Sequence, residues 1–302
     1  MELSLVDGER LAGLVSISQS IEALQRAFQR DDPELPNRQH LDVGGGDLLV
    51  MPAWSDGASG VKLVTVAPGN PERGLPLIHG VYALFEKPSL RPIALFDAAP
   101  LTALRTAAVS ALATTHMARA ESETLMIFGA GVQAAAHLET MNEVLQLTRV
   151  VVVSRTPADA EVLLAKARRL GLSAELGTPD NVREADVICT CTTSAKPLFD
   201  GALLQPGAHV NAIGSYRPEA RELDDRTMER AQLVVDTPTA LKESGDLLGP
   251  LERGLVRREE VSLLADVLDG SGRRSPEDIT VFKSVGAAMQ DLAVAEAAAA
   301  KL

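Results

Sequence analysis

The stretch LMIFGAGVQAAAH, residues 125–137, decides the fold that this sequence predicts. Four apolar residues, typical of a buried strand, lead directly into GAGVQA (129–134), the G-x-G-x-x-A form of the dinucleotide-binding fingerprint. Gly129 permits the tight turn, Gly131 lets backbone approach a pyrophosphate, and Ala134 lets the helix pack closely on the sheet. The first N–H groups of that helix favour an anion. We therefore expect a nicotinamide dinucleotide to contact Gly129, Ala130, Gly131, Val132 and Gln133.

The region after this stretch alternates between strands and helices. β-rich runs recur as RVVVV (149–153), DVICTC (186–191), AHVNAIG (208–214) and LVVDT (233–237), with helical or connecting stretches between them. Such alternation is typical of an α/β fold with a doubly wound parallel sheet of Rossmann type. This context makes the glycine pattern more than a simple tight turn, which is its alternative reading. A last helix is expected from Ser284.

The first third of the chain has a different pattern. Ser16 and Gln19 form a capping box before a helix whose apolar residues recur at helical spacing. Four β-rich runs follow at 48–54, 61–66, 77–85 and 93–98, and no helical pattern separates them. They predict a mainly antiparallel sheet, so this part is of the α+β type. A helix is expected next, from about Thr102 to Ala120.

Composition excludes several classes of partner. The 302 residues are 46% hydrophobic but include only six Phe, two Tyr and one Trp, so the core is aliphatic. A net charge of −12 argues against a nucleic-acid or anionic-membrane partner, because phosphate binding needs clustered Lys and Arg. We see no signal peptide and no apolar run long enough to span a bilayer. Cys189 and Cys191 fit buried thiols, and we expect a cytoplasmic protein.

The end of the second strand of the alternating region predicts which nicotinamide cofactor is used. An acidic residue at this place usually accepts the ribose 2′-hydroxyl of NAD. This chain has Ser154, Arg155 and Thr156 instead, and no acid before Asp159. A guanidinium suits a 2′-phosphate, so NADP(H) is favoured over NAD(H). The alternative is an ordinary exposed arginine at a strand end.

Other catalytic classes lack their motifs. The five histidines never occur at the i, i+3 or i, i+4 spacing of a ligand pair. H-E-x-x-H, G-x-S-x-G and the phosphate-binding G-x-x-x-x-G-K-[ST] are all missing. We expect no metal, and we set aside hydrolase and nucleotide triphosphatase functions.

Blocks along nearly the whole chain resemble the ornithine cyclodeaminase/mu-crystallin family. The blocks, in chain order, are GVKLVTVAPGNPERGLPLIHGVYALF (60–85), LTALRTAAVSALA (101–113), FGAGVQA (128–134), PGAHVNAIGSYRPEARELDD (206–225), LKESGDLL (241–248) and ITVFKSVG (279–286). The resemblance implies a dimerisation and substrate-binding domain over 1–118 and 275–302, interrupted by a Rossmann NAD(P)-binding domain over 119–274. It also implies a homodimer, joined through the first domain's sheet. The implied chemistry is hydride transfer at a carbon that bears nitrogen and adjoins a carboxylate.

The resemblance further implies three cationic site residues. Arg38 matches the arginine that holds the substrate carboxylate, for which a guanidinium is well suited. Lys62 matches the lysine beside the reacting carbon, and Arg105 matches an arginine that faces substrate and cofactor. Without the resemblance, we would interpret each of these three residues as a charge on the surface, although Lys62 interrupts an apolar strand. His79 is an alternative proton donor that could equally be buried packing.

Further cofactor contacts carry over from the family to the ends of later strands. Besides Ser154, Arg155 and Thr156, these are Thr192, Thr193, Ile213, Gly214 and Ser284. The hydroxyl residues among them have a structural alternative as helix caps or turn formers.

Two departures from the family's pattern bear on the reaction. Ornithine cyclodeaminases have an aspartate where this chain has the run GSYRP (214–218), and a glutamate where it has Leu49. A diamine substrate needs such a group for its second nitrogen. The sequence therefore resembles the mu-crystallin and ketimine reductase members, which implies NAD(P)H-dependent reduction of a cyclic imino acid of Δ1-pyrroline-2-carboxylate or Δ1-piperideine-2-carboxylate type. The alternatives are deamination by an ornithine cyclodeaminase or alanine dehydrogenase, and an NADP(H)-dependent small-molecule binding protein without turnover.

Overall fold

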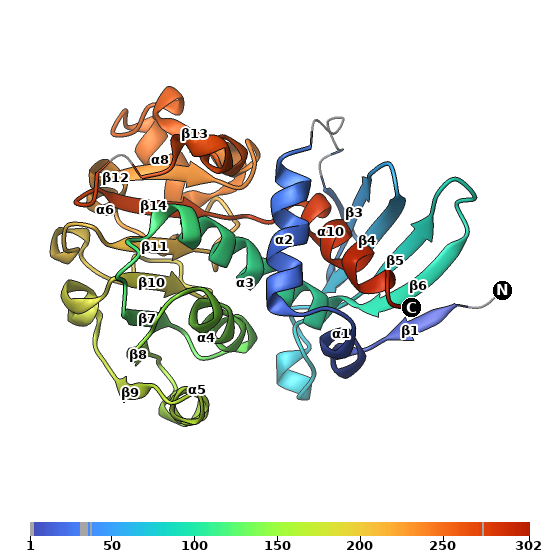
Figure 1. Cartoon of the computed structure of the whole chain (residues 1–302), viewed down its shortest axis with the longest axis horizontal. Coiled ribbons are helices and arrows are strands. Elements are labelled where there is room, and N and C mark those ends of the chain that lie inside the picture. Colours follow the sequence, from blue (N-terminus) through green and yellow to red (C-terminus); the bar gives the residue numbers. More distant parts are fainter. Residues whose placement is uncertain (1–2, 31–35, 37, 274) are drawn as a thin grey trace. The chain divides into compact units, whose positions relative to one another are not determined.

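The computed structural model describes residues 3–30, 36, 38–273 and 275–302. The chain divides into two compact units, one of Met1–Ala108 with Ala287–Leu302 and one of Val109–Gly286 (Figure 1). The second unit is thus inserted into the first. The sequence predicts boundaries at 118/119 and 274/275. The structure divides the chain at 108/109, within the helix Ala98–Met117, and at 286/287, after the strand Ile279–Lys283, which belongs to the sheet of the second unit.

The first unit contains a six-stranded sheet among its described residues. Its strands are β1 (Ser4–Val6), β2 (Gln39–Asp42), β3 (Asp47–Trp54), β4 (Ala58–Val66), β5 (Ile78–Glu86) and β6 (Pro92–Asp97), in the order β1-β6-β5-β4-β3-β2. The neighbours from β2 to β6 pair antiparallel, as the sequence predicts, whereas β1 pairs parallel with β6. In β3 and β4, buried and less buried residues alternate over most of the strand, so one face of the sheet belongs to the core.

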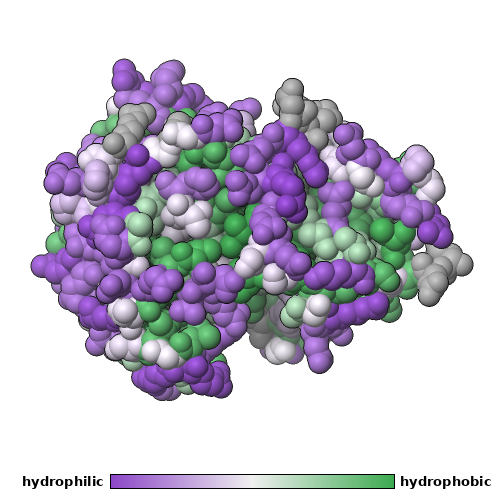
Figure 2. All heavy atoms as spheres, in the orientation of Figure 1, coloured by the Kyte–Doolittle hydropathy of each residue, from purple (hydrophilic) through white to green (hydrophobic). Residues whose placement is uncertain are grey.

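Helices cover that core face. They are α1 (Gly8–Leu14), α2 (Ile17–Phe28) and α10 (Ala288–Ala299), with α10 packed against β3, β4 and α2 (Figure 1). The predicted capping box is present, since Ser16 Oγ accepts from Gln19 N and Gln19 Oε1 accepts from Ser16 N. Hydrophilic side chains follow the outward face of α2 (Figure 2), as an amphipathic helix requires. A short turn of helix, Pro71–Arg73, precedes β5.

Helix α3 (Ala98–Met117) begins earlier than the sequence predicts. The carboxylate of Asp97 accepts from the backbone N–H of Ala99, so an acidic residue caps the helix rather than a threonine after Pro100. Pro100 then lies in the first turn, where a missing N–H removes no helical hydrogen bond.

The second unit contains an eight-stranded sheet whose pairings are all parallel. Its strands are β7 (Thr124–Phe128), β8 (Arg149–Val153), β9 (Ser173–Leu176), β10 (Val187–Thr190), β11 (His209–Ala212), β12 (Ala231–Val235), β13 (Val261–Leu263) and β14 (Ile279–Lys283), in the order β13-β12-β14-β11-β10-β7-β8-β9. Its helices are α4 (Val132–Val144), α5 (Pro157–Arg169), α6 (Asp225–Arg230), α7 (Ala240–Glu243), α8 (Gly245–Glu252) and α9 (Leu264–Asp266). The doubly wound parallel sheet predicted from the sequence is confirmed.

This topology gathers particular loops at one edge of the second sheet. The strand order reverses between β7 and β10, and in such a sheet ligands bind beyond the carboxyl ends of the strands at the reversal. The sheet's core is aliphatic, as the composition predicts, with Phe128 and Phe199 as an aromatic contact within it. No helix in the described part of the chain is long and apolar enough to cross a membrane.

Candidate active site

The fingerprint turn after β7 has the geometry that its two glycines predict. Gly129 has φ +101°, and a Cβ there would lie 2.5 Å from the carbonyl oxygen of Cys191, so only glycine fits. Gly131 is the N-cap of α4 and makes no side-chain cap. Nothing lies within 4 Å of where its Cβ would be, which leaves room for a phosphate beside the helix N-terminus. Ala134 is fully buried, so α4 packs closely on the sheet.

The loop after β8 presents the expected polar residues. Ser154 Oγ accepts from the backbone N–H of Thr156 at 3.2 Å, and Arg155 between them is exposed. Helix α5 begins directly afterwards at Pro157. A guanidinium at this position is accessible to an anion.

A buried carboxylate organises the loops that follow β10 and β11. Glu222 accepts from Thr192 N and Oγ1 with one oxygen, at 2.9 and 2.7 Å. Its other oxygen accepts from Thr190 Oγ1 at 2.8 Å, Gly214 N at 2.8 Å and Ser215 N at 3.2 Å. One side chain therefore fixes two loops at the edge of the sheet where β10 and β11 end.

A buried ion pair supports this carboxylate. Asp246 Oδ1 accepts from the backbone N–H groups of Glu222 and Leu223, at 2.7 and 2.9 Å. Its Oδ2 lies 2.9 Å from Lys283 Nζ, and both side chains are buried. Sequence reasoning missed Glu222 and Asp246, although both lie in blocks that carry the family resemblance. No local signal marked them, because both stand among other charged and polar residues in the sequence.

Two of the hydroxyl residues expected to bind cofactor have other hydrogen bonds. Thr192 donates to Glu222, and Ser284 Oγ donates to Asp236 Oδ2 at 2.6 Å. Thr193 is exposed and Ile213 is half-buried. Ser284 does not begin the last helix, which starts four residues later at Ala288. The bonds of Thr192 and Ser284 are those that the structural alternative describes, and their contacts with a cofactor stay a prediction.

The first unit brings the expected cations together around a residue that the sequence analysis missed. Lys62 on β4 is 3% exposed and Arg105 on α3 is 6% exposed, while Asp291 on α10 is fully buried. Lys62 Nζ lies 2.7 Å from Asp291 Oδ2, and Arg105 Nε donates to Asp291 Oδ1 at 3.1 Å. Arg105 Nη1 also donates to Gln290 Oε1 at 2.8 Å. We call Lys62, Arg105 and Asp291 the cationic cluster.

Burial changes the proton affinity of this cluster. Desolvation is the largest effect on Lys62 and lowers its pKa to about 8, although Asp291 acts in the opposite direction. The positive charges of Arg105 and Arg38 also lower this pKa. Arg38 is half-buried, and its charge has the smallest effect on the pKa of Lys62.

The face of the sheet separates Lys62 from His79. Lys62 is paired with Met51 and Tyr82 in the neighbouring strands and shares their buried face. His79 on β5 is paired with Thr65, at odd spacing from Tyr82, so it lies on the opposite face, where it is exposed. His79 is thus turned away from the cluster and lies on the exposed face of the sheet in the single chain.

Asp291 had a sequence signal of its own. Helix α10 is apolar on nearly all sides, and Gln290 and Asp291 are both fully buried within it. A charge on such a helix needs a buried cation as partner. The sequence does not say which one, because Arg105 and Asp291 are 186 residues apart.

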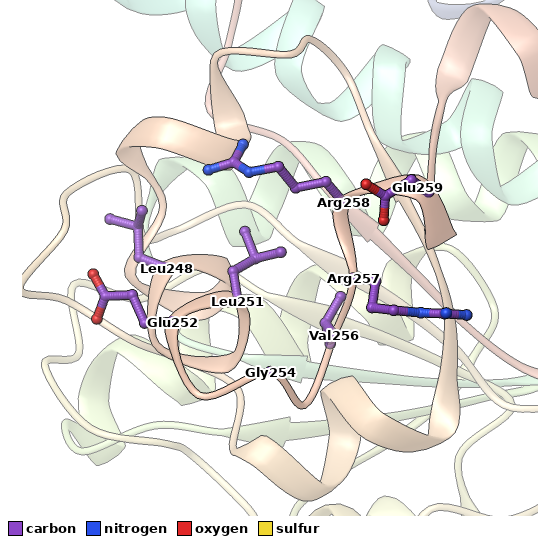
Figure 3. A pocket seen from close by; sticks show the side chains of 8 residues that line it. All are labelled: Leu248, Leu251, Glu252, Gly254, Val256, Arg257, Arg258 and Glu259. Carbon is purple, nitrogen blue, oxygen red and sulfur yellow. The ribbon is translucent and has the colours of Figure 1, made fainter.

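A surface pocket elsewhere does not coincide with these residues. It encloses about 370 Å³ beside the end of α8 (Figure 3). Its lining consists of Leu248, Leu251, Glu252, Gly254, Val256, Arg257, Arg258 and Glu259. None of these is an expected site residue. In the described part of the chain, no three His, Cys, Asp or Glu residues gather as metal ligands would.

The two arrangements, a dinucleotide-type edge and a buried cationic cluster, agree with a comparison of the whole chain. The model of the ornithine cyclodeaminase/mu-crystallin family matches residues 5–301. The chain belongs to this family.

Individual members of the family are similar over most of their length. A Δ1-pyrroline-2-carboxylate reductase of Bacillus cereus is 38% identical over 258 residues, which cover 82% of this chain and 79% of the relative. A solved Thermococcus litoralis Δ1-pyrroline-2-carboxylate reductase in complex with NADH and L-proline is 31% identical, with a TM-score of 0.93 and coverage of 99% and 97%. An archaeal alanine dehydrogenase dimer with bound NAD is also 31% identical, with a TM-score of 0.93 and coverage of 100% and 96%.

Proposed function

We propose that this protein is an NAD(P)H-dependent oxidoreductase that reduces a cyclic imino acid to the cyclic amino acid. The observation that carries the proposal is the charge balance of the cationic cluster. Lys62 and Arg105 place two positive charges against the one carboxylate of Asp291, all nearly inaccessible to water. An uncompensated buried charge is costly, so the cluster is suited to an anionic ligand such as a substrate carboxylate.

The names of the relatives support this class of substrate. The Bacillus cereus relative is a Δ1-pyrroline-2-carboxylate reductase, and the Thermococcus litoralis enzyme of that name was solved with NADH and L-proline. In this chain the apolar Leu49 lies on the same sheet face as Lys62. A second amine, as in ornithine, would find no carboxylate at that position.

Each cation has a defined part in the reduction. Arg105 and Arg38 bind the substrate carboxylate through charged hydrogen bonds. A bound nicotinamide would supply the hydride that reduces the imine carbon, and would thereby be oxidised. Lys62 Nζ donates a proton to the imine nitrogen, so that C=N becomes CH–NH, and the amine of Lys62 regains a proton from solvent after the product has left. Protonation of the imine also makes its carbon more electrophilic.

The residues of the second unit fit a dinucleotide. The open space at Gly131 and the uncapped start of α4 suit the pyrophosphate, and the run 129–133 forms the turn around it. Arg155 favours NADP(H) over NAD(H) through a 2′-phosphate. Steady-state KM values for NADPH and NADH test this preference. Arg155→Ala should raise KM for NADPH about tenfold and leave KM for NADH nearly unchanged, whereas Arg169→Ala, at another exposed arginine of the unit, should change neither.

A panel of substrates tests the reaction itself. NADPH oxidation is measured with Δ1-pyrroline-2-carboxylate, Δ1-piperideine-2-carboxylate, and pyruvate plus ammonia, and the reverse reaction with proline and ornithine. We expect the highest kcat/KM with one of the two cyclic imino acids. Preference for pyruvate plus ammonia would indicate an alanine dehydrogenase, and preference for ornithine a cyclodeaminase. Tight NADPH binding without any turnover would favour a binding protein.

The outer face of the first sheet suits a second copy of the chain. The cross-strand row Pro52, Val61, Ala83, Leu95 and Leu5 is entirely apolar. On this face Leu5 is 68% exposed and Val81 is 43% exposed. We infer a homodimer through this face, as the solved archaeal relative is a dimer. Val81→Arg should halve the mass measured by light scattering, and an unchanged dimer would exclude this interface.

A further inference from the structure

The role of Asp291 follows from how its two oxygens are used. Oδ1 accepts from Arg105 Nε, and Oδ2 faces Lys62 Nζ. Both contacts are within 3.1 Å, and the carboxylate has no exposure to water. Asp291 therefore lies between the two most buried cations of the proposed site and contacts both of them.

The same contacts determine which edge of Arg105 remains available. Nε donates to Asp291 and Nη1 donates to Gln290, so helix α10 holds two of the three guanidinium nitrogens. Among the residues that the structure describes, Nη2 has no hydrogen-bond partner. A guanidinium held on one side presents its remaining N–H groups in a fixed direction.

We propose that Asp291 is the positioning residue of this site: it holds the Lys62 ammonium in place as a proton donor and fixes Arg105 so that Nη2 is directed to the substrate carboxylate. This inference rests on the proposed function. It assigns no direct contact with substrate to Asp291. The residue acts through the two cations that it touches.

The charges that face Lys62 predict the direction in which its pKa shifts when each of them is removed. Asp291 from α10 is the negative charge next to it, while Arg105 from α3 and Arg38 before β2 are positive. Tyr82 from β5 adds a neutral phenol, because burial, with smaller effects of Asp291 and Glu296, raises its pKa. Removing Asp291 should therefore lower the pKa of Lys62, and removing Arg105 should raise it.

The first experiment is the pH profile of kcat/KM. A proton donor must be protonated, so activity should fall as the pH rises through the Lys62 pKa of about 8. In Asp291→Asn, this basic limb should move down by about one pH unit or more, and the substrate KM should rise because Arg105 loses its anchor. Glu296→Gln is the matched control on the same helix, since Glu296 accepts from Ser55 and has no contact with Lys62. Its profile should coincide with that of the unchanged protein.

The second experiment needs no substrate. Protein labelled with carbon-13 at the lysine ε-carbons is titrated by NMR, and Lys62→Met identifies the Lys62 signal by its loss. Asp291→Asn should shift that titration to lower pH and Arg105→Met should shift it to higher pH. If Asp291→Asn does not fold, Arg105→Met still tests the sign.

The outcomes separate the two ideas. Opposite shifts of the Lys62 signal, with no turnover in the substrate panel, would support the positioning role and reject the proposed reaction. Turnover combined with a Lys62 titration that neither variant moves would overturn the role of Asp291 and leave the reaction standing.

Discussion

The two units each contain a buried lysine–aspartate pair, and the two pairs differ in what else the aspartate binds. Lys62 and Asp291 lie 2.7 Å apart in the first unit, and Lys283 and Asp246 lie 2.9 Å apart in the second. Asp246 turns its other oxygen to two backbone N–H groups, so its pair is neutral overall. Asp291 turns its other oxygen to a second cation, which leaves a net positive charge.

This difference separates a scaffold from a site. A buried pair whose charges balance needs no ligand, and the Asp246 pair holds the segment that carries Glu222. A buried pair with an extra cation has an electrostatic need that only an anion meets. Burial and distance alone therefore do not identify a functional lysine. The sum of charges around it does.

Removing the site lysine should change activity far more than stability. Lys62→Met deletes the proposed proton donor, and we expect kcat/KM to fall about a thousandfold, or about 4 kcal/mol in transition-state free energy. Asp291 keeps Arg105 as its partner, so the free energy of unfolding should change by less than about 1 kcal/mol. Steady-state kinetics and urea denaturation measure the two quantities. Near-normal turnover would rule out the proton-donor role.

Removing the scaffold lysine should do the reverse. Lys283→Met leaves Asp246 as a buried charge without its cation, which should lower the free energy of unfolding by about 3 kcal/mol. Adding Asp246→Asn removes the charge but keeps an oxygen for the two backbone N–H groups, and should restore most of the loss. Urea denaturation of both variants tests this. Equal stability of the single and double variants would mean that the ion pair is not what Lys283 contributes.

The pKa values of buried basic side chains also differ between the units, since they lie above 7 for Lys62 in the first and below 7 for two histidines in the second. In the second unit, burial lowers the pKa of His137 to about 4 and that of His209 to about 3. The unfolded chain, with histidine near 6.5, takes up protons first as the pH falls. Stability is thus complete above about pH 6.5, and each histidine costs about 2 kcal/mol between pH 7 and pH 5. Urea denaturation at both pH values should show a smaller loss for His137→Gln, and an identical loss would contradict this origin.

The sequence predicts those parts of the fold that repeat a pattern over enough residues. The strands Thr124–Phe128 and Arg149–Val153 each contain four consecutive apolar residues, and the fingerprint turn after the first has a local steric cause at Gly129. Strands β1, β2, β9 and β13 have only three or four residues with polar ones among them, and their neighbours in the sequence do not extend them into a β-rich run. Strand β14 belongs to the second unit because it pairs with β11 and β12. The sequence around β14 does not predict these partners.

The site divides in the same way between local and distant information. Lys62 and Arg105 lie in blocks that resemble the family, so both were expected, and the structure buries both. Asp291 and Glu222 escaped because a buried carboxylate is defined by its partners, and those come from other elements. His79 lies in a family block as well, but strand alternation turns it away from Lys62. Proximity in sequence to a site is a weak guide where neighbouring residues alternate between two faces.

The smallest effect expected concerns the carboxylate that the scaffold pair supports. Glu222→Gln replaces one acceptor oxygen by an N–H₂ group that faces the donors of Thr192 or of Gly214 and Ser215, so the loops after β10 and β11 should loosen. We expect KM for NADPH to rise about tenfold, or about 1.4 kcal/mol, with kcat little changed, because the lost order concerns cofactor binding. Glu219→Gln, on the exposed part of the same loop, should leave both values unchanged. A fall in kcat without a change in KM would instead mean that Glu222 acts on the reacting groups. The purely structural role that we give to the neutral Lys283–Asp246 pair, which supports Glu222, would then be wrong.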